Sequence, residues 1–94
     1  MPLFPGQATA EGTRAFADRS INSGRTVRPH FRKSSTGLDL SSLGLGTYIG
    51  PPDAPTDLAV EQAVTVCLQS GRINAIDTAI NYRYQRAERS IGRA

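Results

Sequence analysis

The strongest constraint on the fold is a helical repeat of apolar residues that lies between two short apolar runs. Within residues 57–70, apolar side chains recur at the spacing i, i+3, i+4, i+7 and i+8, namely Val60, Ala63, Val64, Cys67 and Leu68. Polar side chains take the opposite side, namely Glu61, Gln62, Thr65 and Gln69. This spacing predicts an amphipathic helix. Thr56 is expected to cap its first turn, and Gly71 is expected to end it in the left-handed conformation.

The apolar runs on either side of this helix predict two strands. Residues 43–48 precede it and residues 73–78 follow it, while three prolines within residues 49–55 oppose regular structure. A strand, a helix of about 14 residues and a second strand form a βαβ unit with parallel strands. Such a unit leaves open sheet edges and an uncovered apolar face, so we expect it to be one part of a larger, incomplete α/β fold.

The residues before the βαβ unit predict a hairpin that follows a less regular amino-terminal segment. Residues 31–33 and 38–40 are two short extended runs, and Gly37 between them is free to adopt positive φ. Residues 1–29 are expected to be poorly ordered, with a short helix over residues 10–19 capped by Thr9. Beyond the second strand, residues 85–94 predict the start of a second helix.

Composition argues against several classes of protein, namely membrane-spanning, secreted, disulfide-rich and metal-binding proteins. The chain has 94 residues, and it contains no apolar run of the length that spans a membrane and no apolar stretch of the secretory type at its start. Cys67 is the only cysteine, which excludes an internal disulfide framework, and the lone His30 makes no metal site. These features favour a cytoplasmic location and a function without a metal.

The net charge of +3 is unevenly distributed, with +4 in residues 1–33, −4 in residues 34–82 and +3 in residues 83–94. One interpretation is a small basic nucleic-acid binder that uses the arginines of residues 83–93, with Tyr82 and Tyr84 as stacking groups. The simpler interpretation is that these arginines form the solvated side of a helix. A third is a βαβ interaction module that completes its sheet with a partner.

Glycines in the first strand invite comparison with dinucleotide-binding folds. Gly44, Gly46 and Gly50 do not fit the Rossmann fingerprint, because Ile49 stands where its third glycine belongs. Two prolines also follow where that fingerprint opens a helix directly. A (β/α)₈ barrel fits better, since its functional residues lie at the carboxyl ends of strands and Asp77 ends the second strand here.

Two segments then make the pattern specific. The run Gly44-Leu45-Gly46-Thr47-Tyr48 resembles the first barrel strand of the aldo-keto reductases. The run Asp77-Thr78-Ala79-Ile80-Asn81-Tyr82, followed by Glu88 and Gly92-Arg93-Ala94, is similar to a motif of that family and to the start of its next helix. The resemblance covers residues 30–94. It implies the amino-terminal portion of a (β/α)₈ TIM barrel, with a hairpin at its base.

The resemblance also implies a function. Members of the family use NADPH to reduce a small carbonyl substrate, and a tyrosine protonates the carbonyl oxygen. By position, Tyr82 would be that proton donor and Asp77 the partner of an active-site lysine. Gly46, Thr47, Tyr48 and Asp77 would lie beside the nicotinamide end of the cofactor.

The roles implied for Asp77 and Tyr82 require a third group, an ammonium cation. A free tyrosine has a pKa of about 10 and is a poor acid at neutral pH, but a neighbouring ammonium group favours its phenolate. A carboxylate would hold that ammonium group in place. The sequence has one lysine, Lys33, which like His30 falls on the upstream hairpin and does not match the family's lysine and histidine. We therefore expect the 94-residue chain alone to fold weakly and to be inactive.

Each candidate residue also has a structural interpretation. Asp77 can cap the turn after its strand, and Tyr82 and Tyr48 can be packing residues. Cys67 lies on the apolar face of its helix and is expected in the core. Glu88 can pair with one of the nearby arginines at positions 83, 86 and 89.

Overall fold

The computed structural model describes residues 7–94, which form three α-helices, one 3₁₀ turn and four short strands. The elements in chain order are helix α1 (Ala10–Asn22), the 3₁₀ turn η1 (Arg28–His30), strands β1 (Phe31–Lys33), β2 (Asp39–Ser41) and β3 (Leu45–Gly46), helix α2 (Ala54–Gln69), strand β4 (Ile76–Asp77) and helix α3 (Arg86–Arg93). The protein is thus a mixed α/β structure, as the sequence predicts.

Two small sheets organise the described residues. Strands β1 and β2 form an antiparallel hairpin in which Arg32 lies opposite Leu40, and Gly37 in its turn has a φ of 86°. Strands β3 and β4 are parallel, with Leu45 opposite Ile76 and Gly46 opposite Asp77. Helix α2 connects β3 to β4, which confirms the predicted βαβ unit.

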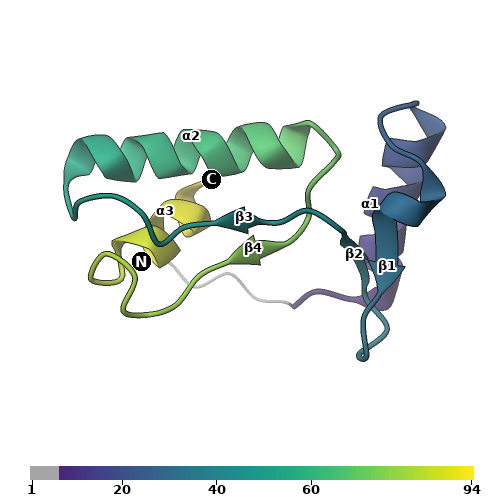
Figure 1. The fold of residues 1–94 in the computed structure, drawn as a ribbon, viewed down its shortest axis with the longest axis horizontal. Coiled ribbons are helices and arrows are strands. Elements are labelled where there is room, and N and C mark those ends of the chain that lie inside the picture. The colour runs from purple at the N-terminus through teal and green to yellow at the C-terminus, as the bar shows by residue number, and fades with distance from the viewer. Residues whose placement is uncertain (1–6) are drawn as a thin grey trace.

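The molecule is elongated, 38 × 24 × 20 Å; the hairpin lies at one end of it, and the parallel pair lies nearer its middle, beside α2 (Figure 1). Helix α2 runs along the β3–β4 pair, and α3 packs against α2. Helix α1 packs against the hairpin, where the Phe16 and Phe31 rings meet edge to face at 6.2 Å. The βαβ unit with α3 therefore forms one half of the molecule, and α1 with the hairpin forms the other.

Side-chain oxygens cap the starts of α1 and α2. The Thr9 hydroxyl accepts a hydrogen bond from the backbone N–H of Gly12 at 2.9 Å, as predicted, and α1 continues to Asn22, three residues beyond the predicted end. Helix α2 begins at Ala54, so the prediction that Thr56 caps it is wrong. Asp53 is the cap, because its carboxylate accepts from the backbone N–H of Thr56 at 2.9 Å. Pro55 is compatible with the first helical turn, where backbone N–H groups have no partner within the helix.

The regular strands and the buried face of α2 are smaller than the sequence predicts. Strand β3 covers two of the predicted six residues and β4 covers Ile76–Asp77, although the backbone N–H of Leu45 also donates to the carbonyl of Ala75 at 3.0 Å. On α2, Val64 is fully buried but Cys67 is only half-buried and Leu68 is exposed. Two short strands offer little surface for the helix to cover.

The apolar core is correspondingly thin. The buried apolar residues among residues 7–94 are Ala17, Phe31, Val64 and Ala87. Large apolar side chains remain exposed on α2 and on the loops around the parallel strands, namely Leu43, Ile49, Leu58, Val66 and Ile80. The uncovered apolar surface that the βαβ pattern predicts is therefore present.

Hydrogen bonds join the two halves of the molecule. The Asn74 side chain accepts from the backbone N–H of Ser41 and donates to the carbonyl of Asp39, both at 2.8 Å. One ring nitrogen of His30 lies 2.6 Å from the carbonyl oxygen of Arg72. Arg25, which lies between α1 and the hairpin, donates to the carbonyl of Gln69 at 2.7 Å. Residues 1–6, which begin the segment expected to be poorly ordered, lie outside the described residues.

Candidate functional site

The carboxyl ends of β3 and β4 bring the predicted site residues together. Gly46 and Asp77 are paired in the parallel ladder, and the Thr47 hydroxyl donates to the backbone carbonyl of Asp77 at 2.8 Å. Tyr48 follows Thr47 directly, and its ring meets the ring of Tyr82. Two segments that are about 30 residues apart in sequence are thus neighbours at one end of the sheet.

Tyr48 and Tyr82 form an edge-to-face aromatic pair. Their ring centroids lie 5.0 Å apart with an angle of 69° between the ring planes. Tyr48 is 67% exposed, whereas Tyr82 is partly buried. This geometry is favourable for two aromatic rings, and it fixes the position of Tyr82 relative to the loop after β3.

The polar ends of Asp77 and Tyr82 are not engaged with each other. Asp77 is exposed, and among the described residues neither its carboxylate nor the Tyr82 hydroxyl has a side-chain hydrogen bond. Thr47 differs, because it is 3% exposed and its hydroxyl is committed to the Asp77 backbone. The predicted cofactor-binding residues therefore divide into exposed positions, Gly46, Tyr48 and Asp77, and one buried position, Thr47.

The turn after Tyr82 has an uncommon backbone. Three consecutive non-glycine residues, Arg83, Tyr84 and Gln85, have φ values of 50°, 55° and 69°. The left-handed conformation costs about 1–2 kcal/mol for each such residue, because Cβ approaches the following carbonyl oxygen. A turn of this shape persists only where surrounding contacts hold it.

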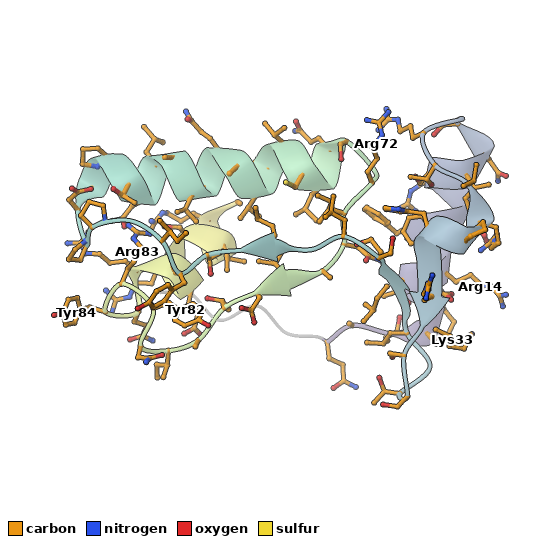
Figure 2. The ribbon with its side chains drawn as sticks, in the orientation of Figure 1. Arg14, Lys33, Arg72, Tyr82, Arg83 and Tyr84 are labelled. Carbon is orange, nitrogen blue, oxygen red and sulfur yellow. The ribbon has the colours of Figure 1, made fainter. Side chains whose placement is uncertain are left out.

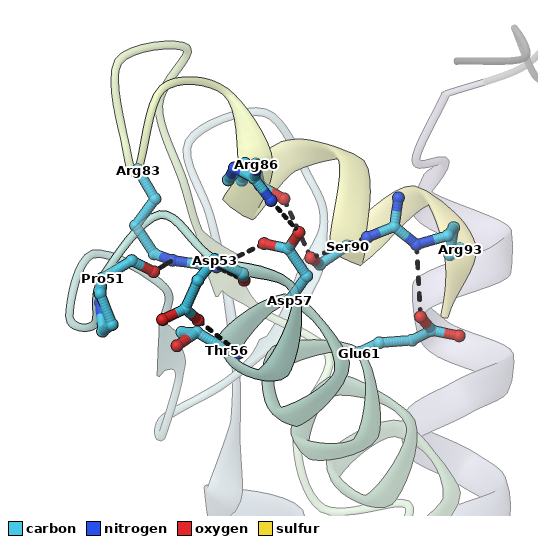
Figure 3. Close-up of polar contacts among 9 residues, drawn as sticks. All are labelled: Pro51, Asp53, Thr56, Asp57, Glu61, Arg83, Arg86, Ser90 and Arg93. Atoms are coloured by element: carbon cyan, nitrogen blue, oxygen red, sulfur yellow. Dashed lines mark hydrogen bonds and ion pairs between the residues drawn. The ribbon is translucent and has the colours of Figure 1, made fainter.

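A buried guanidinium supplies those contacts (Figure 3). The Arg83 side chain is 1% exposed, and its Nε donates to the carbonyl of Pro51 at 3.1 Å. Its Nη2 lies 2.5 Å from a carboxylate oxygen of Asp57 and 3.5 Å from the carbonyl oxygen of Asp53. The buried positive charge is thereby paired with a partly buried carboxylate on the first turn of α2.

Asp57 and Glu61 also engage the arginines of α3. Arg86 contacts the second carboxylate oxygen of Asp57 at 2.5 Å, and Arg93 contacts Glu61 at 3.3 Å. Three of the four arginines proposed for nucleic-acid contact thus form ion pairs within the protein, which weakens that interpretation. Among the described residues Glu88 forms no ion pair, so the prediction that it pairs with a nearby arginine is wrong. The nearby arginines instead face the carboxylates of α2, which packs against α3.

The same helix start perturbs the titration of Asp53. The pKa of Asp53 lies below its ordinary value, because the side chain and then the backbone N–H of Thr56 donate hydrogen bonds to the carboxylate. The charges of Arg83 and Arg86 contribute in the same direction. The ionised form of this capping residue is thus the favoured one.

The lysine and the histidine of the chain lie far from Tyr82. Figure 2 places Lys33 on the hairpin and Tyr82 at the opposite end of the molecule. The Lys33 ammonium lies 4.0 Å from an Asp39 carboxylate oxygen, and His30 is bonded to the carbonyl of Arg72. Neither residue can serve as the cation beside Asp77 and Tyr82 in this arrangement.

Sequence reasoning missed the ion pair between Asp57 and Arg83. In the sequence, Asp57 is only an acidic residue near the start of an expected helix, and Arg83 is only one member of a basic cluster. The two residues are 26 positions apart, and no periodic pattern connects them. The one available signal was the placement of an arginine directly after the candidate tyrosine.

Residues 7–94 contain neither a candidate metal site nor a helix that could span a membrane. No group of three or more His, Cys, Asp or Glu side chains is arranged to hold a metal ion. None of the helices described has the length and apolar character needed to cross a bilayer. Comparison with known proteins adds no family assignment, because no protein-family model and no solved structure matches the chain.

Proposed function

We propose that residues 30–94 form the amino-terminal part of a (β/α)₈ barrel of the aldo-keto reductase type, in which Tyr82 protonates a carbonyl oxygen during NADPH-dependent reduction. The observation that carries this proposal is the meeting of the two resembling motifs. Gly46 lies opposite Asp77, and the Tyr48 ring contacts the Tyr82 ring, at the carboxyl ends of two parallel strands. Barrel enzymes place their reacting groups at that end of the sheet.

The exposed residues at this end suit a cofactor. A Cβ atom added to Gly46 would meet no atom within 4 Å, so its backbone is open to a planar group. Tyr48 and Asp77 are exposed beside it. Bound NADPH would supply the hydride, and Gly46, Tyr48 and Asp77 would line its nicotinamide end.

The acid chemistry requires a cation that the described residues do not bring to Tyr82. In the proposed mechanism, Asp77 orients an ammonium group, and that group lowers the cost of removing the proton from the Tyr82 hydroxyl. Lys33 is at the other end of the molecule. A complete barrel has about 250 residues, so the missing group would come from strands beyond those described.

The proposal predicts that the 94-residue chain does not oxidise NADPH in the presence of a simple aldehyde. Turnover above a protein-free blank would contradict the assignment of the missing cation to other strands. A chimera gives the positive test: residues 30–94 replace the equivalent segment of a complete aldo-keto reductase, and NADPH oxidation is followed. We expect activity in the chimera and its loss in Y82F.

The neighbouring tyrosine provides a matched control. Tyr84 lies two residues from Tyr82, is 82% exposed and carries the same phenol. The Y84F chimera should retain activity, because the ring that pairs with Tyr48 at the strand ends is that of Tyr82. Equal losses in Y82F and Y84F would contradict the role of Tyr82 as proton donor.

A second candidate function is an interaction module that completes its sheet with a partner. The exposed apolar side chains on α2 and around β3 favour it, because isolated two-residue strands with uncovered apolar neighbours gain by association. Sedimentation over a range of protein concentrations tests this candidate. A dimer with protected strand amides would favour the module, and a monomer at all concentrations would count against self-association.

A further inference from the structure

The turn between β4 and α3 holds Tyr82 from two directions. The ring of Tyr82 contacts Tyr48, which follows β3, while the side chain of the next residue, Arg83, crosses to the start of α2. Arg83 donates there to the carbonyl of Pro51 and pairs with Asp57. Two adjacent residues thus hold the same β3–α2 loop at different points.

The same loop has little space for a side chain at Gly50, beside the Arg83 guanidinium. A Cβ atom added to Gly50 would lie 2.6 Å from Cγ2 of Thr56 and 3.9 Å from Nε of Arg83. Gly50 itself has a φ of 118°, which side chains rarely tolerate. A side chain at residue 50 would therefore clash with Thr56, so the loop requires glycine at this position beside Arg83.

One carboxylate, that of Asp57, contacts the Arg83 guanidinium directly. The Arg83 side chain is 1% exposed, and Asp57 is the acidic residue that contacts it among the described residues. Arg86 contacts the other oxygen of Asp57 but is 39% exposed, so water stabilises its charge independently. Loss of the Asp57 charge would leave the buried Arg83 without its ion-pair partner, and only the charge of the Asp53 carboxylate, which forms no direct ion pair with it, would remain nearby. Such a loss is strongly unfavourable for a buried charge.

We propose that Asp57 and Arg83 are positioning residues for Tyr82. Their ion pair keeps Arg83, Tyr84 and Gln85 in left-handed conformations, and this shape of the turn keeps the Tyr82 ring against Tyr48. The catalytic meaning of this positioning rests on the proposed reductase function. The positioning itself does not depend on it.

The test compares two substitutions that each replace a carboxylate of α2 with the neutral amide of similar shape. Asp57→Asn removes the partner of the buried Arg83, whereas Glu61→Gln, one turn later, removes only the partner of the exposed Arg93. The full 94-residue chain is labelled with ¹³C and ¹⁵N, and nuclear Overhauser effects between the Tyr48 and Tyr82 rings are measured. We expect these ring-to-ring signals in the unmodified chain and in E61Q, and we expect their loss in D57N. Backbone shifts of α1 and the hairpin should remain unchanged in both variants.

Retention of the Tyr48–Tyr82 signals in D57N would overturn the proposal and leave the reductase assignment intact, since the measurement needs neither cofactor nor substrate. Conversely, an inactive chimera would count against the reductase function without changing the ring signals. If D57N does not fold, exchange of the Arg83 Nε proton in the unmodified chain decides the question. Slow exchange is expected for a buried proton bonded to the Pro51 carbonyl, and exchange as fast as that of the exposed Arg89 would overturn the proposal.

Discussion

The Thr47 hydroxyl donates a hydrogen bond to the backbone carbonyl of Asp77, 2.8 Å away, across the carboxyl ends of β3 and β4. The regular ladder between these strands ends one residue earlier, at the pair Gly46–Asp77. The side chain of Thr47 therefore extends the pairing of two very short strands by one bond. It also fixes the backbone of Asp77 beside the segment that leads to Tyr82.

Removal of this hydroxyl should destabilise the protein. In T47V the shape of the buried side chain is kept, but the carbonyl of Asp77 loses the hydroxyl donor of a part-buried hydrogen bond. We expect the free energy of unfolding to fall by about 1–2 kcal/mol. Because the core is small, urea unfolding is measured in about 0.5 M sodium sulfate, which strengthens apolar burial.

T65V is the matched control for this prediction. The Thr65 hydroxyl donates at 2.8 Å to the carbonyl of Glu61 within α2, where that carbonyl already belongs to the helix. We expect a change of less than about 0.5 kcal/mol. Equal losses in the free energy of unfolding in T47V and T65V would show that the hydrogen bond from Thr47 to Asp77 stabilises the protein no more than a hydroxyl bond within a helix does.

Asn74 links the two halves of the molecule, and its substitution should lower stability more than T47V does. Its side chain replaces a strand partner for β2, since it accepts from the backbone of Ser41 and donates to the backbone of Asp39. N74A removes both bonds, and we expect a loss of about 2–3 kcal/mol in urea unfolding. N81A removes the same side chain at an exposed loop position and should change stability by less than about 0.5 kcal/mol. A hairpin whose amide exchange is unaffected by N74A would contradict this link.

The sequence was most informative where a local pattern fixes the structure. The apolar repeat of residues 60–68 predicts α2 as a helix, and the position of Gly71 predicts its left-handed end, which has a φ of 71°. The hairpin around Gly37 and the order of strand, helix and strand were also predictable. These features depend on neighbours in the chain, so a single sequence contains their cause.

Features that depend on distant residues were not predictable in this way. The start of α2 is a separate, local miss: Asp53, rather than Thr56, caps the helix, and Pro55 is compatible with the first helical turn. The extents of β3 and β4 depend on how much sheet surrounds them, and apolar periodicity does not encode that extent. Arg83 is buried only because α2 presents Asp57 to it, which is a consequence of how α2 and α3 pack.

The left-handed turn also predicts a stabilising substitution. Gln85 has a φ of 69°, and its side chain makes no capping hydrogen bond at the start of α3. Glycine adopts this conformation without the clash of a Cβ atom, so Q85G should raise the free energy of unfolding by about 1 kcal/mol. Q62G is the contrasting control, because a glycine in the exposed interior of α2 should lower stability by about 1 kcal/mol. A destabilised Q85G would show that residue 85 is not left-handed in solution.

The capping carboxylate of Asp53 predicts a dependence of stability on pH. The pKa of Asp53 is lowered in the folded protein from its ordinary value of 3.8, so the unfolded chain binds this proton more readily. The stabilisation from this group is therefore fully present above pH 3.8 and is lost as pH falls through the lower folded value.

Asparagine at the same position also caps helices, but it does not titrate. In urea unfolding from about pH 6 to about pH 2, the advantage of the unmodified chain over D53N should be constant at the upper end and should shrink below about pH 4. Using this difference cancels the titration of the other carboxylates, which are common to both proteins. A difference that stays constant to the lowest pH, or grows there, would contradict the hydrogen bonds from Thr56 as the source of the lowered pKa.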